Sequence, residues 1–223
     1  MSGGVHPAQI LRAGVPAERA GLGLVLLHGR GGSAADILGL ARVLQRDDVT
    51  AVAPEAAGNS WWPVSFLAPM SQLAPGLENA LAAVDNAVAT LQAEGLARER
   101  IAVAGFSQGA CLALEWAARR GGPLTAVLGL SGGLVGTADA PGRPDPALYG
   151  HTPKAMDQAG RLDGVPVWLG CHAQDPHIPA ARVQASAETF TRLGAKVEMR
   201  LHPGVGHGIV QADVAAMRRL LAG

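Results

Sequence analysis

Residues 101–110 read Ile-Ala-Val-Ala-Gly-Phe-Ser-Gln-Gly-Ala, and the interpretation of the chain starts from this stretch. The first four residues are apolar, follow a charged segment and end at a glycine, which is typical of a buried strand. Residues 110–118 form a longer, nearly all apolar run, which is typical of a buried helix. The Gly-x-Ser-x-Gly pattern between them indicates a sharp reversal at Ser107, because flanking glycines remove the Cβ clashes of such a turn. Ser107 is thus expected at a helix N-terminus, where backbone N–H groups can hold an oxyanion.

The same five-residue pattern occurs again at residues 129–133, around Ser131. This serine also follows an expected strand, but residues 134–141 after it have the composition of a loop and not of a helix. We therefore interpret Ser131 as a polar residue at a strand end and Ser107 as the candidate nucleophile. The alternative for Ser107 is a helix N-cap that happens to lie between glycines.

The composition limits the classes of protein. With 223 residues, 48% hydrophobic and 16% charged, the chain is expected to fold as one globular domain over residues 1–223. Its 18 basic and 18 acidic residues give no net charge, which argues against nucleic acid as a partner. No apolar run has the length of a membrane span, and residues 1–14 do not resemble a secretory signal. We expect a cytoplasmic location, and the chain could form a homodimer.

Strands and helices are expected to alternate along the chain, which predicts a mostly parallel sheet with helices on both faces, an α/β fold. The ends of the chain and two internal segments are less regular: residues 1–20 are expected to form one or two short edge strands, residues 55–75 a long loop, and residues 134–164 a loop with at most one short helix near 154–159. The expected strands are 22–27, 49–53, 101–104, 125–130, 165–169 and 196–201, and the expected helices are 33–44, 77–91, 110–118, 179–193 and 210–221.

Three residues after strand ends have the chemistry of nucleophilic catalysis. A serine hydroxyl needs a base to take its proton, histidine suits this role near neutral pH, and a carboxylate must hold the imidazole in the right tautomer. The order Ser107, Asp175, His207 is that of α/β hydrolases, with Asp175 expected after the seventh strand position and His207 after the eighth. An oxyanion would be held by the backbone N–H groups of Gln108 and Arg30, the latter in the glycine-rich turn at residues 28–32.

The other histidines have simpler interpretations. His28 is expected to bond neighbouring backbone and shape its turn, and His202 to be a structural residue at a strand end. Cys171, His172 and His177 surround Asp175 and allow a metal-binding alternative, but no other ligand cluster of matching spacing supports it, so a metal is not our main expectation. Cys111 and Cys171 are interpreted as small buried apolar residues.

Four segments together resemble the phospholipase/carboxylesterase group of α/β hydrolases, to which acyl-protein thioesterases belong. They are His-Gly-Arg-Gly-Gly at 28–32, Gly-Phe-Ser-Gln-Gly at 105–109, Asp-Pro-His-Ile-Pro at 175–179 and Gly-His at 206–207. The resemblance covers about residue 22 to the end and implies an α/β-hydrolase fold with no large cap domain, the triad Ser107, Asp175 and His207, and no cofactor. The thioesterase branch usually carries a different residue at Arg30 and an acidic one near Gly32, and this departure argues against protein deacylation and favours a bacterial-type small-ester carboxylesterase.

The expected activity is that of a serine hydrolase, a carboxylesterase of the carboxylic-ester hydrolase class (EC 3.1.1), acting on small, short-acyl esters. The alternatives are a thioesterase or lysophospholipase and a ligand-binding member of the fold without turnover. Trp61, Trp62 and Phe66 lie in the expected loop 55–75, after a strand end, and are the candidate substrate-binding residues. One indole is expected to pack on the sheet, and the other to form a wall of the acyl pocket.

Overall fold

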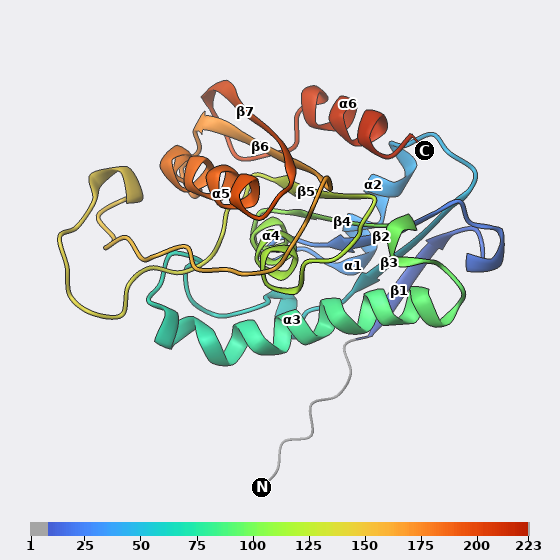
Figure 1. Ribbon diagram of the computed structural model, residues 1–223, viewed down its shortest axis with the longest axis horizontal. Coiled ribbons are helices and arrows are strands. Elements are labelled where there is room, and N and C mark those ends of the chain that lie inside the picture. Colours follow the sequence, from blue (N-terminus) through green and yellow to red (C-terminus); the bar gives the residue numbers. More distant parts are fainter. Residues whose placement is uncertain (1–8, 223) are drawn as a thin grey trace, which may run out of the picture.

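The computed structural model describes residues 9–222, and within them seven strands form one sheet (Figure 1). Their order across the sheet is β1-β3-β2-β4-β5-β6-β7. β1 runs antiparallel to β3, and all other neighbouring pairs are parallel. The strands are β1 (Ile10–Gly14), β2 (Leu22–Leu27), β3 (Val49–Pro54), β4 (Ile101–Phe106), β5 (Ala126–Leu130), β6 (Pro166–Gln174) and β7 (Lys196–Val205).

Six α-helices in the described residues cover both faces of this sheet (Figure 1). They are α1 (Ala34–Ile37), α2 (Gly39–Arg42), α3 (Met70–Ala93), α4 (Gln108–Arg120), α5 (Ala180–Arg192) and α6 (Gln211–Leu220). Short 3₁₀ turns are η1 (Ala17–Arg19), η2 (Ala57–Asn59), η3 (Arg98–Arg100) and η4 (Pro146–Leu148). The expected mostly parallel sheet with helices on both faces is confirmed.

The alternation of side chains along each strand divides the core into two layers. In β2, Val25 and Leu27 pack in the layer formed with α3, α4 and α5. Leu24 and Leu26 point the other way, into the layer formed with α1, α2 and α6. All four are fully buried, because a central parallel strand has a helix layer on each side. Continuous apolar runs in the sequence are therefore the signature of these strands.

The expectation of a loop as far as residue 75 was wrong, because α3 begins at Met70 and contains Pro75. Two contacts from a distant part of the chain stabilise its first turn. The N–H of Met70 donates to the carbonyl of Thr137 (3.3 Å), and the N–H of Ser71 donates to the carboxylate of Asp139 (2.7 Å). Such partners satisfy the free N–H groups of a helix start. Because the partners lie almost 70 residues away in sequence, local pattern does not predict this start.

Residues 134–164 are irregular as expected, but the short helical turn lies at η4 and not near 154–159. Residues 154–159 run between α4 and α5 without helical structure. The guanidinium of Arg192 accounts for this, since it donates to the carbonyls of Met156 (2.6 Å) and Gln158 (3.2 Å), which an α-helix would use internally. The segment around η4 projects from the body of the molecule (Figure 1).

The N-terminal region contributes one edge strand, β1, and the turn η1, while residues 1–8 lie outside the described part of the chain. Counted in the described residues, Asp175 therefore follows the sixth strand and His207 the seventh, not the seventh and eighth. β7 lies at the opposite edge, as its alternating pattern predicts. No helix in residues 9–222 combines the length and apolar character needed to cross a membrane.

Candidate active site

The chain reverses at Ser107, between β4 and α4, with φ 55° and ψ −119°. This backbone region is unfavourable for a residue with a side chain. The flanking positions must be glycine because other backbone atoms approach them too closely for a side chain. A Cβ at Gly105 would lie 2.2 Å from the carbonyl oxygen of Gly109, and a Cβ at Gly109 would lie 2.1 Å from that of Leu27. The Gly-x-Ser-x-Gly pattern is therefore explained by packing of the turn against itself and against β2.

The side chains of Ser107, His207 and Asp175 form one chain of hydrogen bonds. The Nε2 of His207 lies 2.8 Å from the Oγ of Ser107, and its Nδ1 lies 2.8 Å from the Oδ2 of Asp175. The three residues follow β4, β7 and β6, whose carboxyl ends meet at one edge because the strands are parallel. The structure thus brings together the three residues that sequence order singled out.

The carboxylate of Asp175 is fully buried and has several donors. Its Oδ1 accepts the N–H groups of His177 (2.8 Å) and Ile178 (3.0 Å), and its Oδ2 contacts His207 and, at 3.5 Å, the Sγ of Cys171. Burial by itself would raise the pKa of Asp175, but the hydrogen bonds from His207 and the two amides outweigh it and lower the pKa. The group is held as an anion facing the imidazole.

The two N–H groups predicted to hold an oxyanion border the same cavity as Ser107. Gln108 begins α4, and Arg30 lies in the turn after β2, the strand that pairs with β4. This turn is close to the serine, since a Cβ at Gly29 would lie 3.3 Å from the Cβ of Ser107. Neither N–H donates to an acceptor within the described residues. Both groups are available to a ligand oxygen.

His28 fixes the shape of this turn, in the role expected from sequence. Its Nε2 accepts the N–H of Ala56 (3.1 Å), so its Nδ1 carries the proton and donates to the carbonyl of Gly29 (2.9 Å). The carbonyl of His28 in turn accepts the indole N–H of Trp61 (2.9 Å). The turn is thus bonded to the loop that follows β3.

The side chain of Gln108 has a role that sequence reasoning missed. Its Oε1 accepts the N–H of Trp61 (3.0 Å) and the hydroxyl of Ser60 (3.3 Å), and its Nε2 donates to the carbonyl of Trp62 (2.9 Å). The amide group is nearly fully buried. The residue after the nucleophile therefore also anchors the loop after β3. A glutamine inside the serine motif was the available signal, but its partners are not visible in sequence.

The expectation that Trp61 or Trp62 forms a wall of the substrate site is not met by the structure. Both indoles belong to the core layer beneath α3, with exposed fractions of 7% and 1%, and neither is among the residues that line the cavity at Ser107. Both rings pack inward because the bonds to Gln108 and His28 hold the backbone and indole of this loop. Phe66 does line the cavity.

The cavity at Ser107 has a volume of about 500 Å³. His177, which sequence reasoning considered only beside Asp175, lies on its wall with its ring centroid 4.8 Å from that of His207. The lining consists of Gly29, Arg30, Pro63, Val64, Ser65, Phe66, Phe106, Ser107, Gln108, Cys111, His177, Ile178 and His207. Pro63, Val64 and Phe66 supply one side of the apolar wall, and Phe106, Cys111 and Ile178 supply the rest.

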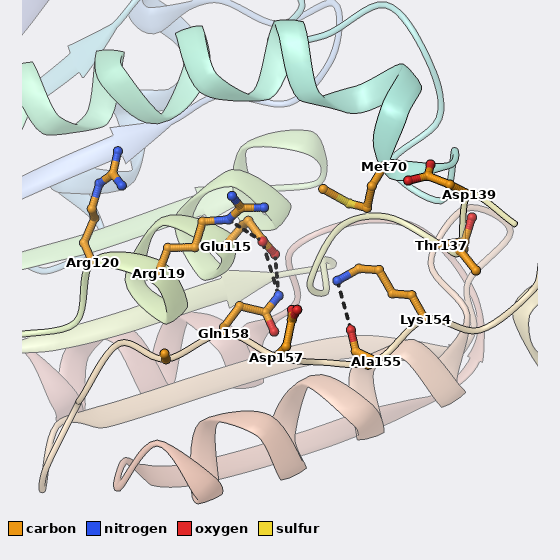
Figure 2. Close-up of a pocket in the computed structure, with 12 residues that line it drawn as sticks. Met70, Glu115, Arg119, Arg120, Thr137, Asp139, Lys154, Ala155, Asp157 and Gln158 are labelled. Atoms are coloured by element: carbon orange, nitrogen blue, oxygen red, sulfur yellow. Dashed lines mark hydrogen bonds and ion pairs between the residues drawn. The ribbon is translucent and has the colours of Figure 1, made fainter.

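A larger cavity of about 650 Å³ lies beside the C-terminal half of α4 (Figure 2). Two of its charged groups, Glu115 and Arg119, pair with each other. Glu115 is fully buried and accepts hydrogen bonds from Arg119 (2.7 Å) and Gln158 (3.2 Å), as Figure 2 shows. None of the triad residues lines this cavity. The chemistry therefore favours the smaller cavity as the candidate active site.

The remaining candidates lie in structural positions. Ser131 is 1% exposed, and its hydroxyl donates to the carbonyl of Gly208 (3.2 Å), next to His207. His202 is buried against Asp213, with its Nε2 3.0 Å from Oδ1. Ser131 directly follows β5, as the sequence predicted. His202 is a structural residue as expected, but it lies inside β7, which runs to Val205, and not at a strand end.

Both cysteines are buried. Burial raises the pKa of Cys111 to about 12, and burial also raises the pKa of Cys171. Neither thiol is therefore prepared for ionisation near neutral pH. Within residues 9–222, no three His, Cys, Asp or Glu side chains are grouped so as to hold a metal ion.

Comparisons with known proteins identify the family of the chain. A model of the phospholipase/carboxylesterase family matches residues 12–222. Acyl-protein thioesterase 1 of Eremothecium gossypii is 28% identical over 217 residues, which cover 89% of this chain and 86% of that protein. A crystal structure of a phospholipase/carboxylesterase from Dyadobacter fermentans has a TM-score of 0.85 and 37% identity, covering 98% of each chain.

The crystal structure of esterase PE8 is also similar, with a TM-score of 0.73 and 25% identity over 96% of this chain and 97% of that one. These relatives and the parallel sheet confirm the α/β-hydrolase fold, and within the described residues no large cap domain covers the strand ends. Since the family model spans nearly the whole chain, the protein belongs to the phospholipase/carboxylesterase family of hydrolases.

Proposed function

We propose that the protein is a serine carboxylesterase that hydrolyses small esters with short acyl groups. In this proposal Ser107 is the nucleophile, His207 the general base and acid, and Asp175 the carboxylate that orients the imidazole. The observation that carries it is the position of His207, with one ring nitrogen 2.8 Å from Ser107 and the other 2.8 Å from Asp175. The buried, hydrogen-bonded state of Asp175 supports its role as a fixed anion.

The proposed reaction has two halves. The Oγ of Ser107 bonds to the ester carbonyl carbon while its proton passes to the Nε2 of His207, and the N–H groups of Arg30 and Gln108 donate to the resulting oxyanion. The carbon–oxygen bond to the alcohol then breaks, and His207 returns the proton to the leaving alcohol. Water, deprotonated by the same histidine, attacks the acyl-enzyme and releases the acid.

A thioesterase acting on acyl-proteins is the second candidate, because the relative from Eremothecium gossypii carries that name. The same groups could attack a thioester carbonyl, so the triad does not distinguish the two. The cavity does favour short acyl groups. Its apolar wall is limited to a few side chains such as Val64 and Phe66, and each CH₂ gains about 0.8 kcal/mol only where it reaches that wall.

The experiment is to measure kcat/KM for p-nitrophenyl esters from acetate to palmitate, with an S-acyl cysteine peptide as the thioester arm. We expect the highest value between acetate and roughly hexanoate. Phe66→Ala should change the preferred chain length, whereas Met199→Ala, an exposed apolar residue on β7 outside the cavity, should not. Ser107→Ala, which lacks the proposed nucleophile, is the negative control for uncatalysed hydrolysis. An optimum at palmitate, or preference for the thioester peptide, would favour the thioesterase.

A further inference from the structure

In the described part of the chain, the cavity at Ser107 is lined by basic side chains but by no carboxylate. Arg30 is the arginine among the lining residues and brings a guanidinium, a cationic group, to the cavity. No Asp or Glu of residues 9–222 contributes to the lining, because Asp175 is buried behind His207. The N-terminus of α4, which begins after Ser107, adds its positive dipole end. The lining therefore offers positively charged or N–H groups, and no carboxylate of the described residues, to an anionic part of a substrate.

Within residues 9–222, no carboxylate pairs with the guanidinium of Arg30. Its guanidinium donates through Nη1 to the carbonyl of Pro63 (3.2 Å) and through Nη2 to that of Val64 (2.5 Å). These acceptors are neutral. Glu55, the acidic residue of the neighbouring loop, instead accepts the N–H of Ala34 (3.0 Å). A carboxylate on a ligand would thus be the first anionic partner of Arg30.

The position of the guanidinium relates it to the acyl part of a substrate. The backbone N–H of Arg30 borders the place of the reacting carbonyl, and its side chain reaches to the segment 63–66, which supplies one side of the apolar wall beside Ser107. An acyl chain that follows this wall runs along the arginine side chain. A carboxylate a few carbons from the ester carbonyl would then lie within reach of the guanidinium.

We propose that the site selects esters whose acyl group carries a second, ionised carboxylate, that is, half-esters of short dicarboxylic acids, with Arg30 as the anion contact. The inference rests on the proposed ester hydrolysis and names its substrate class. The reaction is the same ester hydrolysis as in the proposed function. Water adds its oxygen to the acyl carbon, the bond to the alcohol oxygen breaks, and the products are the dicarboxylate, the alcohol and a proton.

The test compares two esters of the same shape and different charge, followed by acid release in a pH-stat. One is monomethyl glutarate, and the other is methyl 5-methylhexanoate, in which an isopropyl group replaces the carboxylate. Wild type should prefer the half-ester in kcat/KM by about two- to fivefold, the range of an exposed ion pair. Apolar contact alone would favour the branched ester, so a ratio above one requires the charge.

Two variants and salt separate charge from shape. Arg30→Gln keeps the backbone N–H and an amide donor but removes the charge. Its ratio of kcat/KM for the half-ester to kcat/KM for the branched ester should fall below one. Arg30→Lys should keep the ratio above one. In wild type, raising the ionic strength to about 0.5 M should lower the ratio, since exposed charges are then screened. Arg218→Gln is the matched control, because Arg218 is exposed and also donates to a carbonyl, that of Val43, but does not line the cavity.

The outcomes divide clearly. Preference of wild type for the branched ester, or an equal ratio in wild type and Arg30→Gln, overturns the proposed charge selection while leaving ester hydrolysis intact. Failure to hydrolyse either ester, together with an unreactive Ser107, overturns the proposed function and this inference with it. The salt dependence is measured on the unaltered protein, so the test holds even where a variant does not fold.

Discussion

At the scale of single residues, Asp175 has the most specific surroundings in the candidate site. Asp175→Asn keeps an oxygen for the N–H groups of His177 and Ile178 but turns an amide donor toward the Nδ1 of His207. The imidazole would then be held in the wrong tautomer. We expect kcat/KM for a short ester to fall about 10⁴-fold, while the far-UV circular dichroism stays that of wild type. A loss below tenfold would contradict the orienting role.

The lowered pKa of Asp175 also predicts a pH-dependent difference in stability between wild type and Asp175→Asn. A carboxyl group whose pKa is lower in the folded state stabilises the fold above its unfolded pKa of about 4, and this contribution is lost as the pH falls through the folded pKa. Urea unfolding should therefore show wild type more stable than Asp175→Asn at pH 7 and pH 5. The difference should shrink below about pH 4. A pH-independent difference would contradict the assigned ionisation.

Ser131 is a second residue-scale case, because its hydroxyl holds the loop that carries His207. Its Oγ donates to the carbonyl of Gly208, and its φ is 55°. Ser131→Ala leaves that carbonyl without its partner, at a cost of about 1 kcal/mol of unfolding free energy, and should lower kcat only modestly. Ser131→Gly loses the same bond but relieves the strained φ. Equal activity loss in both variants, measured with one short ester, would assign the effect to the hydroxyl.

At the scale of elements, the loop after β3 depends on the side chain of Gln108, the first residue of α4. Gln108→Ala leaves the buried N–H of Trp61 without its acceptor, at a cost of about 1–3 kcal/mol, whereas the carbonyl of Trp62 keeps the hydroxyl of Ser60 as a donor (2.8 Å). We expect a lower unfolding free energy and faster proteolytic cleavage between residues 55 and 69. The backbone N–H of Gln108 is unchanged by the substitution.

The matched variant is Gln108→Glu, which can still accept from the N–H of Trp61 but cannot donate to the carbonyl of Trp62. Its stability should not reach that of wild type. Wild-type protease resistance in Gln108→Ala would show that the loop is held by the burial of its indoles alone.

At the scale of the whole molecule, the sequence predicted what depends on local pattern. Buried strands such as 22–27 are continuous apolar runs, and the turn at Ser107 carries glycines that its packing requires. The order of Ser107, Asp175 and His207 predicted their meeting, because parallel strands end at one edge.

The features that sequence missed depend on long-range contacts. The start of α3 is stabilised by Thr137 and Asp139, and the segment 154–159 is held out of a helix by Arg192. The inward packing of Trp61 follows from its bonds to Gln108 and His28. None of these partners is near in sequence, so periodicity and propensity carry no information on them.

The central claim is that Ser107, and not the serine of the second Gly-x-Ser-x-Gly pattern, is the nucleophile. The most direct measurement is peptide mass spectrometry after reaction with a fluorophosphonate, which reports the site of the covalent adduct. The account predicts one adduct, on Ser107, formed by wild type and Ser131→Ala and strongly slowed in His207→Ala, since the base is then missing. An adduct on Ser131, or no adduct on wild type, would contradict it.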